Sequence, residues 1–159
     1  MRKMLFVDTT KCTGCESCVD LCSGRKSGVF SEKTSRVRIL KNEAGADFIP
    51  LLCEHCREHL CVDACPVGAI QYNTEVSVFR VDENACTGCG ACEEVCLYKG
   101  IFVSDGVAMM CDLCGGHPAC IPVCYPKALQ YMEVTDEATM ADLKHKIEKL
   151  GRLRRHRHE

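Results

Sequence analysis

The sequence reads Cys-Thr-Gly-Cys-Glu-Ser-Cys-Val-Asp-Leu-Cys over residues 12–22 and Cys-Thr-Gly-Cys-Gly-Ala-Cys-Glu-Glu-Val-Cys over residues 86–96. Both stretches have the spacing Cys-x2-Cys-x2-Cys-x3-Cys. This is the bacterial spacing in which three close cysteines bind one iron–sulfur cluster and the fourth binds a neighbouring cluster. A tight loop can wrap three irons of a cubane, whereas the fourth iron points away and needs a thiolate from elsewhere in the chain.

The other cysteines complete a set of four groups. The chain has 159 residues and 16 cysteines, and every cysteine belongs to a group of four. In chain order the groups are Cys12, Cys15, Cys18, Cys22; Cys53, Cys56, Cys61, Cys65; Cys86, Cys89, Cys92, Cys96; and Cys111, Cys114, Cys120, Cys124. The spacing therefore predicts four 4Fe–4S clusters, with all sixteen cysteines as metal ligands.

Two other uses of cysteine compete with this interpretation. A disulfide scaffold suits short secreted chains, but only four apolar residues follow Met1-Arg2-Lys3 before Asp8, too few for a signal peptide. Structural zinc could use Cys53 with Cys56. Zinc pairs leave the middle cysteine of each Cys-x2-Cys-x2-Cys run without a role, so a zinc-binding structural adaptor is the weaker alternative.

Composition limits the other functions. The formal net charge is -2, which argues against a nucleic-acid binder. No apolar run approaches the roughly 18 residues that cross a bilayer, so we expect no membrane span. With no Trp, five Phe and four Tyr, the chain has few large residues for a core. We expect the clusters to replace part of that core, folding to depend on them, and the protein to be cytoplasmic.

Short strands are predicted between the cysteine groups. Residues 37–40 and 48–52 flank a turn at 42–45, residues 69–72 and 76–81 flank a turn at 73–75, and residues 100–103 and 107–110 flank Ser104-Asp105-Gly106. Residues 65–72 resemble residues 124–131, which indicates an internal repeat. The predicted fold class is α+β: duplicated bacterial ferredoxin-like dicluster units with short helices and β-hairpins, plus a C-terminal helix.

A family resemblance follows from the order of these motifs. The second group reads Cys-x2-Cys-x4-Cys-x3-Cys-Pro, and the last combines Met110-Cys-Asp-Leu-Cys with Pro118-Ala-Cys-Ile-Pro-Val-Cys. Over residues 4–132 the chain resembles the four-cluster electron-transfer subunits of the dimethyl sulfoxide reductase and formate dehydrogenase type. Its compactness resembles the small ferredoxin-like subunits of tungsten aldehyde oxidoreductase and class II benzoyl-coenzyme A reductase. The chain departs from the pattern after Cys22, Cys96 and Cys124, where Ser23, Leu97 and Tyr125 replace proline.

The resemblance implies a pairing of the groups, one with four and two with three. The implied ligand sets are Cys12, Cys15, Cys18 with Cys124; Cys111, Cys114, Cys120 with Cys22; Cys53, Cys56, Cys61 with Cys96; and Cys86, Cys89, Cys92 with Cys65. Groups one and four would then form one unit of a body spanning residues 1–132, and groups two and three, at about 51–100, the other. Spacing alone does not exclude sequential pairing of groups one with two and three with four.

The resemblance also implies a function and partners. The chain would catalyse no reaction itself but relay single electrons between a catalytic, pterin-containing oxidoreductase subunit and an external redox partner. That external partner could be a flavin- or quinone-linked subunit, a ferredoxin or further copies of the chain. A free soluble polyferredoxin is the main alternative.

Two segments follow the body. Residues 133–151 are predicted to hold an amphipathic helix, capped by Asp136 and ended by Gly151, with an apolar stripe of Met140, Leu143, Ile147 and Leu150. The stripe could pack on the body or dock a partner. Residues 152–159 form a basic tail.

A few residues near the cysteines have minor predicted roles. Gly14, Gly88 and Gly90 are candidate backbone donors to sulfur. We expect His55, His59 and His117 to have packing or surface roles rather than to be ligands. Met109 and Met110 are predicted to pack in the core.

Overall fold

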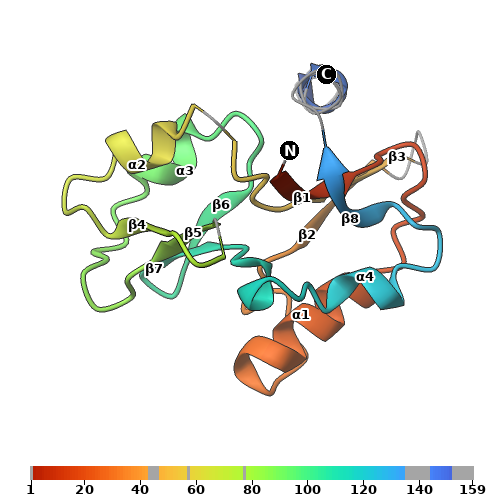
Figure 1. Cartoon of the computed structure of the whole chain (residues 1–159), viewed down its shortest axis with the longest axis horizontal. Helices are drawn as coiled ribbons and strands as arrows, with labels where there is room; N and C mark the ends of the chain where they lie inside the picture. The colour runs from red at the N-terminus through yellow and green to blue at the C-terminus, as the bar shows by residue number, and fades with distance from the viewer. Residues whose placement is uncertain (1, 43–46, 57, 77, 135–143, 152–159) are drawn as a thin grey trace.

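Small antiparallel hairpins joined by short helices make up the chain (Figure 1). The computed structural model describes residues 2–42, 47–56, 58–76, 78–134 and 144–151. Its strands are β1 (Arg2–Val7), β2 (Arg38–Asn42), β3 (Asp47–Leu51), β4 (Ile70–Asn73), β5 (Val78–Val81), β6 (Ile101–Ser104), β7 (Val107–Met110) and β8 (Leu129–Val134). Its helices are α1 (Ser17–Ser27), α2 (Leu60–Asp63), α3 (Ala91–Val95), the 3-10 turn η2 (Leu113–Gly115), α4 (Cys120–Val123) and the segment 144–151. These elements confirm the predicted α+β class.

The predicted hairpins are confirmed, with ends shifted by one or two residues. β2 pairs with β3, β4 with β5 and β6 with β7, each antiparallel. In the β6–β7 turn, Asp105 and Gly106 have φ of 50° and 79°. Two successive positive φ angles define the type I′ turn, whose twist matches that of the strands. The turn predicted at 42–45 begins with Asn42 in β2, and its other residues lie outside the described part of the chain.

The chain folds into two halves because its two ends pair. β1 runs antiparallel to β8, from Arg2 opposite Val134 to Val7 opposite Leu129. This pairing places α1 against α4, while α2 packs on α3. We call residues 52–110 the central half and residues 2–27 with 111–134 the terminal half. Figure 1 shows the central half on the left and the terminal half on the right.

Cysteine side chains form part of both cores. Around the terminal half, Leu5, Val7, Val19 and Leu129 pack with four buried cysteines: Cys18, Cys22, Cys111 and Cys120. In the central half, Ile70, Phe79, Ile101 and Met110 pack with Cys92, and five half-buried cysteines border them: Cys53, Cys61, Cys65, Cys86 and Cys96. The thiols therefore occupy positions that large apolar residues take in ordinary cores, as the scarcity of aromatic residues indicated.

The C-terminal helix packs on the chain's own body. The sequence predicts a helical segment from residue 133, but residues 133 and 134 belong to β8 and pair with β1. The helix therefore starts beyond this strand. The described helical segment covers 144–151, so Gly151 lies in its last turn rather than after it. Leu150 packs against Ile49 and Leu51, whereas Ile147 is 39% exposed. Asp136, Met140, Leu143 and the tail 152–159 lie outside the described residues.

Two lysines attach this helix to loops of both halves. Lys146 is fully buried and forms an ion pair with Glu54, which follows Cys53 in the central half. Lys149 donates to the Thr9 carbonyl at 3.1 Å and pairs with Asp47 at 3.0 Å. Thr9 lies three residues before Cys12. The helix thus contacts the segment leading into cysteine group one and the loop of group two.

Within the described residues, no helix is both long enough and apolar enough to cross a membrane.

Gly88 is expected to tolerate a side chain less well than Gly90. A Cβ at Gly88 would lie 2.3 Å from the Gly106 carbonyl oxygen, whereas a Cβ at Gly90 would meet nothing within 4 Å. Both have positive φ, 65° and 83°. Gly90→Ala should lower the free energy of unfolding by about 1–2 kcal/mol from backbone strain alone. Gly88→Ala should lower it further, as measured by anaerobic urea unfolding. If the two variants lost the same free energy of unfolding, the close approach of the Gly106 carbonyl to Gly88 would not be what limits this position.

The buried ion pair gives a second prediction. Lys146→Met leaves the Glu54 carboxylate buried and unpaired, which typically costs about 3–5 kcal/mol. The helix should then undock, so that amide hydrogen exchange across 144–151 accelerates. Lys144→Met, at an exposed position of the same helix, is the matched control. Adding Glu54→Gln to Lys146→Met should recover part of the protection; no recovery would show that the pair is not what holds the helix.

Candidate metal centres

All sixteen cysteines lie in the described residues, and none forms a disulfide. In groups one, two and three the chain turns sharply two residues before the third cysteine. Glu16, His59 and Gly90 take left-handed φ of 61°, 47° and 83° and cap α1, α2 and α3. The third cysteine is then the second residue of each helix. The turn brings this thiol back toward the first two cysteines of its own loop.

A repeated turn follows the last cysteine of groups two, three and four. The third residue after that cysteine has positive φ: Gly68 (62°), Lys99 (53°) and Lys127 (55°). The next residue is small and buried: Ala69, Gly100 and Ala128. The following residue begins β4, β6 or β8. This shared geometry explains the sequence repeat between residues 65–72 and 124–131 and extends it to residues 96–101.

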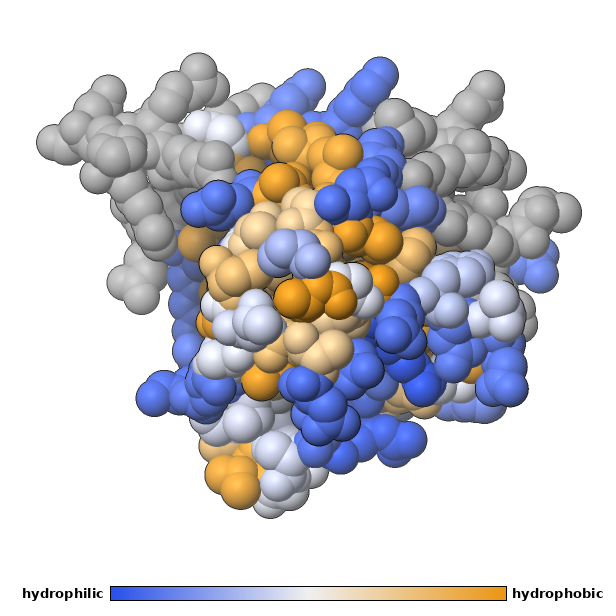
Figure 2. Space-filling view, turned by 90° about the vertical axis from the view of Figure 1, so that its left-hand side faces the viewer, coloured by the Kyte–Doolittle hydropathy of each residue, from blue (hydrophilic) through white to orange (hydrophobic). Residues whose placement is uncertain are grey.

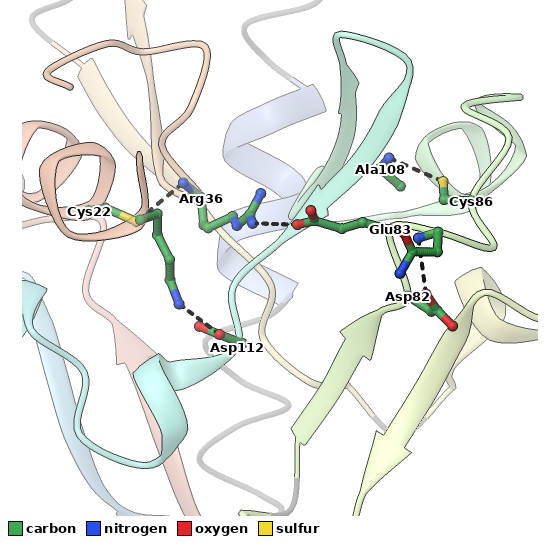
Figure 3. Close-up of polar contacts among 9 residues, drawn as sticks. Cys22, Arg36, Asp82, Glu83, Cys86, Ala108 and Asp112 are labelled. Atoms are coloured by element: carbon green, nitrogen blue, oxygen red, sulfur yellow. Dashed lines mark hydrogen bonds and ion pairs between the residues drawn. The ribbon is translucent and has the colours of Figure 1, made fainter. Parts of the chain in front are cut away.

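The turn directs backbone N–H groups at sulfur. Ala69 donates to Cys65 Sγ at 3.2 Å, Gly100 to Cys96 Sγ at 3.4 Å and Leu129 to Cys124 Sγ at 3.3 Å. In group one, Arg36 donates to Cys22 Sγ at 3.2 Å (Figure 3). The last cysteine of every group therefore accepts a backbone hydrogen bond. Donors to sulfur stabilise the thiolate and tune a bound metal centre.

Further donors reach other sulfurs. Ala108 of β7 donates to Cys86 Sγ at 3.3 Å (Figure 3), and His55 donates its backbone N–H to Cys53 Sγ at 3.4 Å. Burial raises the pKa of Cys12, and a backbone hydrogen bond from Gly14 opposes that rise. Of the three glycines predicted as donors, Gly14 therefore has this role. Gly90 caps α3, and Gly88 lies against the Gly106 backbone.

In the terminal half, thiols of groups one and four are close enough to raise one another's pKa. Burial, then Cys12 and Cys124, raises the pKa of Cys18 to about 12. Burial, opposed by a hydrogen bond from Leu113, raises the pKa of Cys111 to about 12, and Cys22 adds to the rise. Burial, followed by Cys111, Cys18 and Cys22, raises the pKa of Cys120.

An ion pair holds the group-four loop on α1. Lys26 of α1 pairs with Asp112 at 2.7 Å, and Asp112 accepts the N–H of Cys114 at 3.0 Å. Although partial burial opposes it, Lys26 lowers the pKa of Asp112. Arg36, whose backbone N–H donates to Cys22 Sγ, forms an ion pair with Glu83 of the central half at 3.3 Å (Figure 3). These contacts position cysteines that are almost a hundred residues apart in sequence.

In the central half, groups two and three interleave in the same way. Burial, then Cys56 and Cys96, raises the pKa of Cys61 to about 11. A cavity is lined by Cys86, Cys89 and Cys92 of group three together with Cys65 of group two. Despite the opposing effect of burial, backbone N–H groups of residues 67–70 lower the pKa of Cys65. This cavity is therefore lined by four cysteines, one of which has a lowered pKa.

A bound metal would favour the ionised form of these thiols. A coordinating thiol loses its proton outright, and the positive irons would offset the burial that now raises the pKa of Cys18, Cys61 and Cys111.

The histidines and methionines pack as predicted or face solvent. His55 is buried, and its Nδ1 accepts the Phe79 N–H at 3.3 Å. The His59 ring lies 4.4 Å from the Phe79 ring, and His117 is exposed. Met110 belongs to the central core. Sequence reasoning missed the capping conformations of Glu16 and His59, for which the only signal was their shared place two residues before a cysteine.

Comparison with known families agrees with this geometry. Residues 52–99 match the 4Fe-4S dicluster domain, and residues 9–25 match a 4Fe-4S binding domain. The first match contains both cysteine groups of the central half, and the second contains group one.

Several known proteins are similar over most of the chain. The polyferredoxin-like subunit of aliphatic sulfonate oxidoreductase from Pyrococcus furiosus is 33% identical over 78% of the chain and 72% of that subunit. A tetrathionate reductase subunit from Archaeoglobus fulgidus is 36% identical over 86% of the chain and 69% of its own length. The beta subunit of an NADH-dependent phenylglyoxylate dehydrogenase from Aromatoleum evansii is 36% identical over 79% of the chain, which spans only 29% of that subunit.

A solved structure is also similar. The BamBC active-site complex of benzoyl coenzyme A reductase with benzoyl-CoA contains a chain that aligns over 92% of this chain and 89% of its own length. The TM-score is 0.47 at 19% identity, a similarity too low to transfer a partner or an activity. The identities of a third or more with the Pyrococcus and Archaeoglobus subunits, together with the two 4Fe-4S domain matches, show that the chain belongs to the family of polyferredoxin-like iron–sulfur subunits that transfer electrons in oxidoreductase complexes.

Proposed function

We propose that this chain is a non-catalytic relay that binds four 4Fe–4S clusters and carries single electrons between a catalytic oxidoreductase subunit and an external redox partner. One observation supports the proposal most strongly: the cavity of the central half is lined by three cysteines of one group and the last cysteine of another. That combination is the one that a pair of ferredoxin clusters requires.

The ligand sets follow the crossed pairing of the groups. Cys12, Cys15 and Cys18 would bind a cluster with Cys124, and Cys111, Cys114 and Cys120 a second one with Cys22. Cys53, Cys56 and Cys61 would bind a third with Cys96, and Cys86, Cys89 and Cys92 a fourth with Cys65. The packing of α1 on α4 and of α2 on α3 supports this pairing over the sequential one, as does the match of residues 52–99 to one dicluster domain.

The protein's own contribution would be to set the clusters' electronic environment. When bound, each cluster supplies one-electron redox chemistry over a potential range that depends on hydrogen bonds to sulfur and exposure to solvent. The backbone N–H groups of Arg36, Ala69, Gly100 and Leu129 would donate to the clusters' thiolates. Burial differs among the sites: Cys22, Cys111 and Cys120 of one set are buried, whereas all four cysteines of the set Cys53, Cys56, Cys61 and Cys96 are half-buried. The clusters should therefore differ in potential.

The catalytic partner is proposed to contain a tungsten- or molybdenum-pterin cofactor. This rests on the resemblance to electron-transfer subunits of such enzymes and on relatives that are named as oxidoreductase subunits. The names of these relatives mention different substrates, so the substrate is left unassigned. A flavin- or quinone-linked subunit or a ferredoxin would exchange electrons at the other end of the relay. We place the complex in the cytoplasm, where sixteen thiols remain reduced.

Two alternatives predict different outcomes. A free polyferredoxin would purify alone and support turnover by diffusion. A zinc adaptor would bind single ions in place of clusters.

Composition tests the proposed function directly. The chain, purified anaerobically from its native host, should contain about sixteen irons and sixteen sulfides. It should show interacting spins in the EPR spectrum after dithionite reduction and should co-purify with a pterin-bearing subunit. Stoichiometric zinc instead of iron would contradict the relay, and isolation without any partner would favour the free polyferredoxin.

Paired cysteine substitutions test the ligand sets. In the crossed pairing Cys65 and Cys92 bind the same cluster, so Cys65→Ala with Cys92→Ala should remove about four irons. Cys65→Ala with Cys18→Ala should disturb two clusters and remove about eight. Sequential pairing predicts the reverse, because Cys65 would then share a cluster with Cys18. Iron analysis and EPR spin quantitation distinguish the two arrangements.

A further inference from the structure

The negative charge of the chain is concentrated in the central half. Residues 52–110 contain nine acidic and three basic residues, whereas the rest of the chain contains thirteen acidic and seventeen basic ones. The formal net charge of -2 therefore conceals two regions of opposite sign. Opposite fields on two parts of an electron carrier can attract different partners to them.

An apolar surface lies within this acidic region. Four large apolar side chains of the central half are exposed: Leu60 (42%), Val67 (46%), Tyr72 (52%) and Leu97 (54%). They belong to α2, to the loop after it, to β4 and to the segment after α3, and α2 packs on both α3 and β4. Figure 2 looks at this side of the molecule and shows an apolar centre surrounded by hydrophilic side chains. We call these four residues the α2–α3 face.

Ring contacts hold part of this face in place. The Tyr72 ring lies 5.0 Å from the Phe79 ring, and the His59 ring lies 4.4 Å from that same Phe79 ring. Phe79 itself is buried. The exposed Tyr72 is thus supported by the core, so the face is preorganised for contact.

Acidic side chains border the face. Glu58 precedes α2, Asp63 ends it and Glu94 lies in α3, and all three are exposed. In the terminal half, the most exposed aromatic residue has a basic neighbour instead of acidic ones. Tyr125 is 95% exposed, and the exposed charged residue nearest to it in sequence is Lys127.

The α2–α3 face is adjacent to the proposed clusters of the central half. Leu60 directly precedes Cys61, and Leu97 directly follows Cys96. Both cysteines belong to the set Cys53, Cys56, Cys61 and Cys96, so this step rests on the proposed function. Val67 of the same face lines the cavity of Cys65, Cys86, Cys89 and Cys92. Because electron tunnelling falls steeply with distance, a partner on this face would exchange electrons with the clusters of the central half first.

We propose that the α2–α3 face docks a one-electron redox protein that presents an apolar patch bordered by lysine or arginine. The apolar centre supplies contact area, and the acidic border steers a basic partner and orients it. Such an encounter needs only a small interface, since electron-transfer complexes are among the smallest and weakest. This assigns the central half as the place where electrons enter or leave the chain.

Charge reversal on the face tests the proposal. The dithionite-reduced, cluster-loaded chain is mixed with oxidised cytochrome c, a basic one-electron acceptor, in a stopped-flow instrument at increasing salt. Asp63→Lys with Glu94→Lys should slow the reaction at low salt about tenfold or more and abolish its decrease with salt. Asp20→Lys with Glu32→Lys changes the net charge equally at exposed positions elsewhere, and should change the rate less than about twofold.

A second pair of variants tests the apolar centre. Leu97→Ser should slow the reaction at every salt concentration, whereas Tyr125→Ser should not. Equal effects of the two charge reversals, or a rate independent of salt, would overturn the docking face while leaving the relay intact. Concentration-dependent self-association abolished by Asp63→Lys with Glu94→Lys would also overturn it, since the occupant would then be a second copy. If the purified chain contained no iron, the proposed relay and the proposed docking face would both be wrong.

Discussion

The structure depends on one arrangement: in each half, cysteines of one group lie beside cysteines of another. The chain reaches this arrangement twice by different routes. In the central half, α2 and α3 pack within fifty residues of sequence, so the partners are local. In the terminal half, Cys22 and Cys111 come together only because β1 pairs with β8 and Lys26 holds Asp112. The three hairpins, β2–β3, β4–β5 and β6–β7, connect these loops.

Burying thiols in place of apolar side chains has an energetic consequence. A thiol core packs poorly against itself and resists ionisation, as the raised pKa of Cys18 and Cys111 shows. A metal cluster would reverse both effects, because it fills the space between the thiols and stabilises their ionised form. Folding and metal binding are then one equilibrium. The backbone donors at Cys22, Cys65, Cys96 and Cys124 lie ready for that ionised form.

Local features were predictable from sequence, and long-range ones were not. The cysteine spacing and turn signals such as Asp105-Gly106 identified the hairpins and the metal-binding groups, because both act over a few residues. The left-handed conformations of Glu16 and His59 carry no residue-type signal, since neither is glycine. The burial of Lys146 against Glu54 joins residues 92 apart and opposes the usual exposure of lysine. The apolar stripe correctly placed Leu150 on the apolar side of the helix. Only the structure shows that the Leu150 side chain contacts Ile49 and Leu51.

The pairing of β1 with β8 also sets an order of assembly on the ribosome. All eight cysteines of the central half lie in one continuous stretch of nascent chain, which ends with β7 at Met110. The terminal half has its first cysteines early but must wait for Cys111 to Cys124 and for the strand that ends at Val134. For that interval the thiols of group one lack their partners and are open to oxidation or to the wrong metal. A chain built in this nested way gains from a cell that supplies clusters late and keeps its thiols reduced throughout synthesis.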